Sequence, residues 1–167
     1  MKRTSMRMAA AALSGGHQDI VKLLLDKGAD VNAQGGVYGN ALYAASLGGD
    51  QEIVRLLLDK GADINAQGGE YGNALQTASR RGHRDIVKLL LEKGADVNAQ
   101  GGVYGNALNA ASLEGHQEVI KLLLDNGADV NAKGIAYGNA LQAASFGGHH
   151  EIVKLPQKRG ASTSPSK

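Results

Sequence analysis

Histidine and aspartate recur along this chain at a fixed spacing, and both residue types can do chemistry. The histidines follow glycine and occupy one phase of the sequence: His17, His83, His116 and His149. Such a row could supply metal ligands or general bases. Neighbouring units of a helical array lie about 10 Å apart, which is too far for one metal ion to bridge two units. We therefore predict a turn histidine that bonds backbone between the two helices of each unit.

Carboxylates recur in the same way, at Asp30, Asp63, Asp96 and Asp129. Acid–base catalysis would need two of them to converge in a cleft. Their regular spacing instead predicts hydrogen bonding within loops. His149 and His150 are the only adjacent histidines, but neighbouring residues of a helix point to different faces, so we do not predict a metal site there.

The Gly-Gly-x-Tyr-Gly segments are rich in glycine, as phosphate-binding loops are. A phosphate cradle also needs a strand before it and a basic residue after it, and the pattern provides neither. The sequence has no cysteine, no nucleophile elbow and no P-loop motif. We therefore predict no enzymatic activity, no cofactor and no small-molecule substrate.

These residues are positioned by an internal repeat of 33 residues. The string GAD(V/I)NA begins at Gly28 and the string YGNAL at Tyr38, and each returns three times at this spacing. A period of this length predicts a solenoid of stacked units. Within the unit 35–67, Asn40 is a favoured N-cap for a short helix, and acidic residues from Asp50 open a second helix. Gly61 then occupies the place of a left-handed residue after a helix end.

We expect five units, over about 8–34, 35–67, 68–100, 101–133 and 134–156. The first helix, from Met6 to Leu13, begins close to the start of the sequence. Pro156 replaces a core leucine and should end or kink the last helix. The polar segment 157–167 is expected to be disordered. Neither end reads as a polar capping unit, which favours a fragment of a longer array.

The unit resembles the ankyrin repeat. The resemblance rests on Gly82-His83, Ile86-Val87, Leu89–Leu91 and the run Gly94–Ala99. It implies an all-α solenoid of helix-turn-helix units with protruding loops, which binds a protein partner on a concave face made of loop tips and inner helices. The variant GGxYGNALQAAS looks like the arrays of filamentous-fungal STAND or NACHT-type receptors.

Positions that differ between units are the better candidates for partner binding, because each unit would meet a different part of the partner. Near the loop tip these are Val37, Glu70 and Val103. On the first helix of each unit they are Tyr43, Gln76 and Asn109, then Leu47, Arg80, Leu113 and Phe146, and beside these Arg81 and Glu114.

One tyrosine per loop completes the candidate surface: Tyr38, Tyr71, Tyr104 and Tyr137. Tyrosine is enriched at binding hot spots, so the row could contact a partner. Because the residue never changes, we favour the interpretation that the rings stack loop on loop and stiffen the array. Arg80, Arg81 and Arg84 make the third unit basic; we interpret them as a solvated charge cluster, with an acidic-peptide or phosphate contact as the alternative.

The bulk composition narrows the class of partner. The net charge of +2 is too balanced to predict nucleic-acid binding, and no apolar run approaches the roughly 18 residues of a membrane span. The absence of cysteine and of Asn-x-Ser/Thr sequons favours an intracellular protein, cytoplasmic or nuclear. We predict a non-catalytic protein-interaction module; the alternative is a structural or sensor segment of a larger receptor.

Overall fold

The computed structural model describes residues 17–152, and these residues form pairs of short helices. The bounds are α2 Gln18–Asp26, α3 Ala41–Gly48, α4 Gln51–Asp59, α5 Ala74–Arg81, α6 Arg84–Glu92, α7 Ala107–Glu114, α8 Gln117–Asp125 and α9 Ala140–Phe146. A further helical turn begins after α9, at 150–152. The expectations for Met6–Leu13, for Pro156 and for the segment 157–167 fall outside the described residues.

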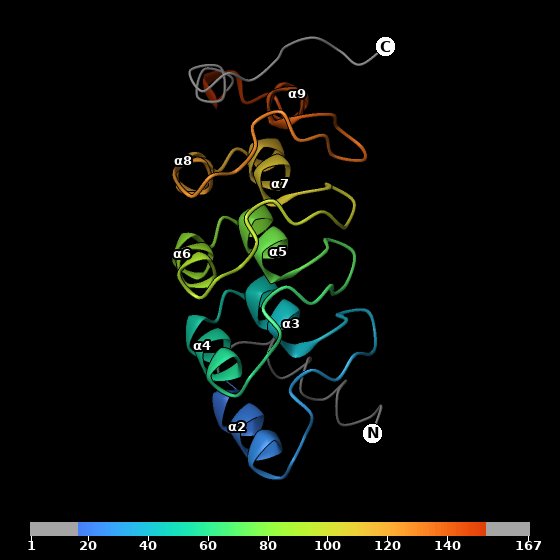
Figure 1. Cartoon of the computed structure of the whole chain (residues 1–167), viewed down its shortest axis with the longest axis vertical. Coiled ribbons are helices and arrows are strands. Elements are labelled where there is room, and N and C mark those ends of the chain that lie inside the picture. The colour runs from blue at the N-terminus through green and yellow to red at the C-terminus, as the bar shows by residue number, and fades with distance from the viewer. Residues whose placement is uncertain (1–16, 153–167) are drawn as a thin grey trace.

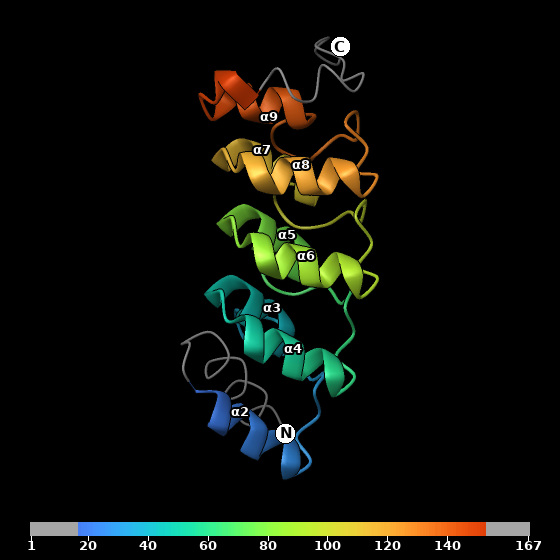
Figure 2. The same ribbon diagram turned by 90° about the vertical axis from the view of Figure 1, so that its left-hand side faces the viewer.

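The helices are arranged in two layers (Figure 1). One layer contains α3, α5, α7 and α9, and the other contains α2, α4, α6 and α8. The long loops project from the α3–α9 layer, on the side away from the second layer. Seen from the side, the pairs lie one above another along the long axis (Figure 2). We call the α3–α9 layer the inner layer and the other the outer layer.

The inner helices begin at asparagine and end at glycine, as the sequence predicts. The side chain of Asn40 accepts a hydrogen bond from the backbone N–H of Tyr43 at 2.8 Å, which fixes the start of α3. The helix ends at Gly49, whose φ of 83° lies in the left-handed region. In α5 the cap is a reciprocal box, because Gln76 also accepts from the N–H of Asn73.

The outer helices are amphipathic and cover the inner layer. In α4, the side chains of Ile53, Val54 and Leu57 are buried, whereas Arg55 on the opposite face is exposed. Their spacing follows the helical period, so one stripe of the helix faces the core. Gly61 follows this helix with a φ of 87°, which confirms the predicted left-handed position.

Alanine allows the inner helices to pack closely. Ala45, Ala78, Ala111 and Ala144 occupy the same phase of their helices and are fully buried. Their small side chains permit short distances between neighbouring helices, and the leucines and isoleucines of the outer layer fill the remaining core. The loops are therefore held at a fixed height along the stack. No helix of the described part has the length and hydropathy that a membrane span requires.

Candidate functional site

The histidine row joins neighbouring units. His83 Nε2 lies 3.4 Å from the carbonyl oxygen of Leu47, and His116 Nε2 lies 2.9 Å from that of Arg80. Each carbonyl belongs to the preceding unit. The prediction of a backbone bond is confirmed, but its predicted place between the two helices of one unit is wrong. The imidazole spans the step between units because it lies against the glycine that ends the preceding inner helix, as His83 does at Gly49.

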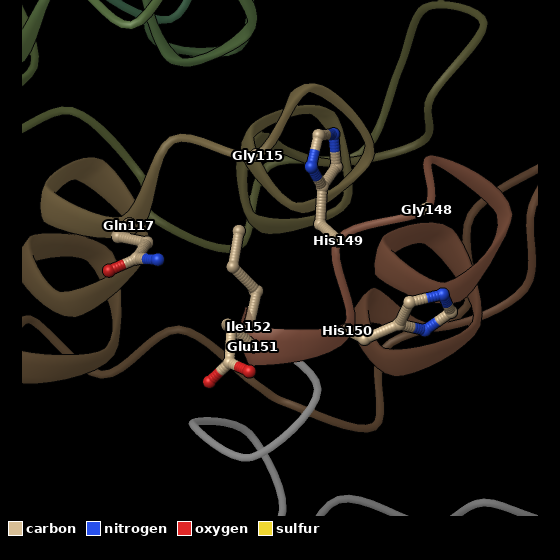
Figure 3. Close-up of a pocket in the computed structure, with 7 residues that line it drawn as sticks. All are labelled: Gly115, Gln117, Gly148, His149, His150, Glu151 and Ile152. Carbon is tan, nitrogen blue, oxygen red and sulfur yellow. The ribbon is translucent and has the colours of Figure 1, made fainter.

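The contact between a histidine ring and a glycine recurs at His149 and Gly115. There it borders a cavity of about 410 Å³ between the last two described units (Figure 3). His149 points towards Gly115, whereas His150 points in a different direction, which confirms the prediction that these neighbours diverge. A cavity of about 480 Å³ lies at the corresponding place beside His83. Because it recurs with the repeat, this cavity belongs to the packing between units. Within residues 17–152, no three His, Asp or Glu side chains are grouped as a metal site would require.

The recurring aspartates bond within their own loops, as predicted. Asp30 Oδ1 accepts a hydrogen bond from the N–H of Asn32 at 2.9 Å, and the same turn recurs at Asp63, Asp96 and Asp129. The asparagine then reaches the next unit, since Asn32 Oδ1 accepts from the N–H of Asp63 at 2.7 Å. These carboxylates and amides therefore form a ladder that ties unit to unit.

Three predicted binding residues are buried and inaccessible to a partner. Tyr43, Gln76 and Asn109 are 2%, 1% and 2% exposed. Each reaches from its inner helix to the following loop. The amide of Gln76 donates to the carbonyls of Ala99, Gly101 and Gly105 at 3.0–3.1 Å.

Tyr43 and Asn109 hold the loops that follow them in the same way. The hydroxyl of Tyr43 accepts a hydrogen bond from the N–H of Tyr71 at 3.3 Å, and Asn109 Nδ2 donates to the carbonyl of Gly138 at 2.8 Å. Burial raises the pKa of Tyr43 above its ordinary value. The variation at this position therefore serves contacts inside the array, and the predicted role in partner binding is corrected.

The tyrosines of three successive loops stack, which confirms the structural interpretation. The ring centroids of Tyr71 and Tyr104 are 5.7 Å apart, and those of Tyr104 and Tyr137 are 6.1 Å apart, with interplanar angles of 20° and 22°. Phe146 of α9 continues the row, tilted by 48° against Tyr137 at 4.9 Å. We call Tyr71, Tyr104, Tyr137 and Phe146 the aromatic row. Tyr38 is half-buried against the core instead.

Arg80 is part of the aromatic row's support and is not a solvated charge. Its guanidinium lies 4.3 Å from the ring centroid of Tyr71, and its Nε donates to the hydroxyl of Tyr104 at 2.9 Å. The same Nε lies 3.3 Å from a carboxylate oxygen of Glu114. Burial lowers the pKa of Arg80, but the Tyr104 hydrogen bond and the neighbouring acidic groups outweigh it and raise the pKa overall. The predicted solvated cluster is therefore wrong for Arg80.

Large apolar side chains are exposed along the loops and at the end of α9. Val37 and Ile135 are each 80% exposed, Phe146 is 73% exposed, and Val103 is 37% exposed. Ile135 was not among the residues predicted from the sequence. It stands where the other loops have glycine, at Gly36, Gly69 and Gly102, so the change of residue type was the signal that could have found it.

The remaining candidates surround this surface with different degrees of exposure. Glu70, Arg81 and Glu114 are exposed, whereas Leu47 and Leu113 are half-buried. We define the loop face as the aromatic row together with exposed residues of the loop tips and of the ends of α5 and α7. The loop-tip residues are Val37, Glu70, Val103 and Ile135, and the helix-end residues are Arg81 and Glu114. Three of the four exposed apolar side chains of the loop face, Val103, Ile135 and Phe146, lie on the last two loops and on α9, whereas Val37 lies on the loop before α3. Its exposed charged residues lie on the units before α9.

Comparison with known proteins identifies the repeat. The family profile described as "Ankyrin repeats (3 copies)" matches residues 6–101 and, in an overlapping second match, residues 44–134. No curated protein matches the chain. The matched ranges include three of the described helix pairs, α3 to α8. The chain therefore belongs to the ankyrin-repeat family.

Proposed function

We propose that this array is a non-catalytic module that binds another protein through the loop face. Ankyrin repeats are in general protein-interaction modules, and exposed apolar side chains support this role here. Six large apolar side chains are exposed in the described part of the chain, and four of them lie on the loop face. The other two, Ile20 and Leu23, lie on α2. A cluster of exposed apolar side chains on a monomer is typical of an interaction site.

The rigidity of the loop face also favours binding. Glycine-rich loops of this kind would cost conformational entropy if they were ordered only on contact with a partner. Here each loop is closed by its own hydrogen bond, as from Gly68 N to the carbonyl of Gly72 at 2.6 Å. The stacked tyrosines and the buried Gln76 hold neighbouring loops in register. The exposed tips are therefore presented in a fixed geometry.

The proposal is tested by comparing the proteins that the full chain captures before and after a change on the loop face. Ile135→Asp and Phe146→Asp place charges where the apolar side chains are exposed, so we expect the fold to be kept. Partners that use this face should be depleted about tenfold or more, as at the centre of an interface. The readout is quantitative mass spectrometry of captured proteins, with far-UV circular dichroism as the folding check.

The matched control is Arg55→Glu, a charge change at an exposed position on the outer face of α4. Partners should be retained by this variant. If the captured set is unchanged by Ile135→Asp and Phe146→Asp, or falls equally with Arg55→Glu, the loop face is not the binding surface.

The setting of the array in the cell is a further part of the proposal. We place it in the cytoplasm or nucleus, because the sequence has neither cysteine nor a glycosylation sequon. The loop sequence also resembles fungal receptor arrays, and a sensor segment of such a receptor would use the same face. Localisation of the tagged chain in its native cell tests the first statement, and the sequence of the complete gene tests the second.

A further inference from the structure

Two adjacent arginines at the end of α5 differ in their electrostatic state. Arg80 is neutralised by Glu114 and held by Tyr104. Arg81 is exposed and makes no ion pair or hydrogen bond within residues 17–152. An unpaired guanidinium is the group that a carboxylate of a partner would meet most favourably.

The side chain of Arg81 can reach the loop face. Arg81 has the same place in its unit as Glu114 has in the next unit, one repeat of 33 residues later. Glu114 extends to the aromatic row, because its carboxylate lies 3.3 Å from Arg80 Nε. The equivalent position on α5 therefore borders the same surface. Glu70, at the tip of the loop before α5, is exposed and would repel a carboxylate placed at the loop tips. The favourable place for an acidic group is thus the helix side of the loop face.

Between Arg81 and the apolar end, the charged side chains with a defined contact at the aromatic row are Arg80, which touches Tyr71 and Tyr104, and Glu114, which pairs with Arg80. The exposed Lys133 lies beyond them, two residues before Ile135 in the sequence. Moving along the row, a partner passes Tyr104 and Tyr137 before it reaches Ile135 and Phe146. Arg81 and Phe146 belong to units that are two steps apart, which is about 20 Å at about 10 Å per unit. An extended chain advances about 3.3 Å per residue, so about six residues span this distance.

Stacking covers the faces that the rings of the aromatic row turn towards one another, whereas Phe146 at its end is 73% exposed. Tyr71 and Tyr104 face each other at 5.7 Å, and the guanidinium of Arg80 lies over Tyr71. A nucleic-acid base needs an open ring face for stacking, and these faces are already covered. Apolar side chains of a peptide can pack against ring edges and against the exposed Ile135 and Phe146. The geometry therefore favours a polypeptide over a single-stranded nucleic acid.

We propose that the loop face takes an extended peptide segment with an apolar side chain against Ile135 and Phe146 and a carboxylate about six residues away, at Arg81. This inference rests on the proposed function and specifies the chemistry of the partner. The apolar contact supplies most of the affinity, because it removes exposed apolar surface from water. The contact at Arg81 fixes the register and direction of the segment.

The test is a selection of random linear peptides of about twelve residues, displayed on phage, against the intact chain. Selected peptides should share an apolar residue and an Asp or Glu about six positions apart. A synthetic copy of the best peptide should then bind about tenfold more weakly to Phe146→Ala. It should bind about fivefold more weakly to Arg81→Glu, and high salt should reduce this second difference.

The matched control is Arg84→Glu, which reverses an exposed charge three residues further along the chain, next to Asp85. This variant should bind the peptide as the unchanged chain does. Selected peptides that lack an acid, or that bind Arg81→Glu as tightly as they bind the unchanged chain, would overturn the inference. The proposed function would stand in that case if Phe146→Ala still weakens peptide binding. Binding that ignores Phe146 as well would remove both. A labelled oligothymidine that binds in an Arg81-dependent way, with no peptide selected, would overturn the inference in favour of nucleic acid.

Discussion

The substitution Gln76→Ala should show how much of the array's stability comes from holding one loop in place. Gln76 is 1% exposed, and its side chain meets two different parts of the molecule. Its Oε1 accepts from the N–H of Asn73 at 2.7 Å, which closes the cap of α5. Its Nε2 donates to the carbonyls of Ala99, Gly101 and Gly105 in the following loop.

The expected loss of stability follows from the groups that would remain without a partner. The carbonyl of Gly105 keeps its hydrogen bond from Gly101 N at 2.8 Å. The N–H of Asn73 and the carbonyls of Ala99 and Gly101 make no other hydrogen bond within residues 17–152. At about 1 kcal/mol for each lost partner, Gln76→Ala should lower the free energy of unfolding by about 3 kcal/mol.

Gln142→Ala is the matched control. Gln142 has the same place in α9 and the same cap, accepting from the N–H of Asn139 at 3.0 Å. It is only partly buried, and its loss should cost about 1 kcal/mol. Urea denaturation followed by far-UV circular dichroism measures both variants, and amide hydrogen exchange over 100–105 reports on the loop. Equal losses for the two variants, or unchanged exchange in this loop after Gln76→Ala, would refute the loop-anchoring role.

Two further substitutions probe the joints between units. Gly49→Ala should destabilise the array more than Gly61→Ala. Both glycines have a positive φ, which costs an alanine about 1 kcal/mol, but only a Cβ at Gly49 would meet the His83 ring, at 2.8 Å. Equal urea midpoints for the two variants would contradict the histidine contact. Tyr43→Phe should cost about 1 kcal/mol near neutral pH, through the lost hydrogen bond from the N–H of Tyr71. Because burial raises the folded pKa of Tyr43, its contribution is full below pH 10 and is lost as pH rises through the folded pKa. The unchanged chain should therefore lose stability above pH 10 more steeply than Tyr43→Phe, and parallel pH profiles of the urea midpoint would show that this tyrosine is not responsible.

The helix pairs could be predicted from the sequence because their signals are local. An asparagine cap such as Asn40, the glycine that ends its helix, and the left-handed Gly61 each act within a few residues of their own position. The repeat then multiplies each local signal. A period of 33 residues also requires stacking, because a single helix pair cannot bury its apolar face.

The role of Gln76 could not be predicted in the same way, because its partners lie 23 to 29 residues further along the chain. In the sequence, the change from Tyr43 to Gln76 to Asn109 looks like adaptation to a partner. The structure shows that these side chains differ in length and in the polar group with which they bond the next loop: the hydroxyl of Tyr43 accepts a hydrogen bond, whereas the amide of Asn109 donates one. Arg80 was misjudged for a similar reason, since its contacts with the Tyr104 hydroxyl and the Glu114 carboxylate come from the loop and helix of the next unit.

Variation between units therefore has two physical causes, and burial separates them. Where the varying residue is buried, as at Gln76, it completes hydrogen bonds that a different residue would leave open, and its substitution acts on stability. Where it is exposed, as at Ile135 or Arg81, it removes little apolar surface from water within the chain and contributes little to folding. Exposed positions can therefore change without loss of the fold, provided that the buried anchors keep the loops in place. Only the second kind of variation can act on partner choice without acting on the fold, and Ile135 and Arg81 are examples of it on the loop face.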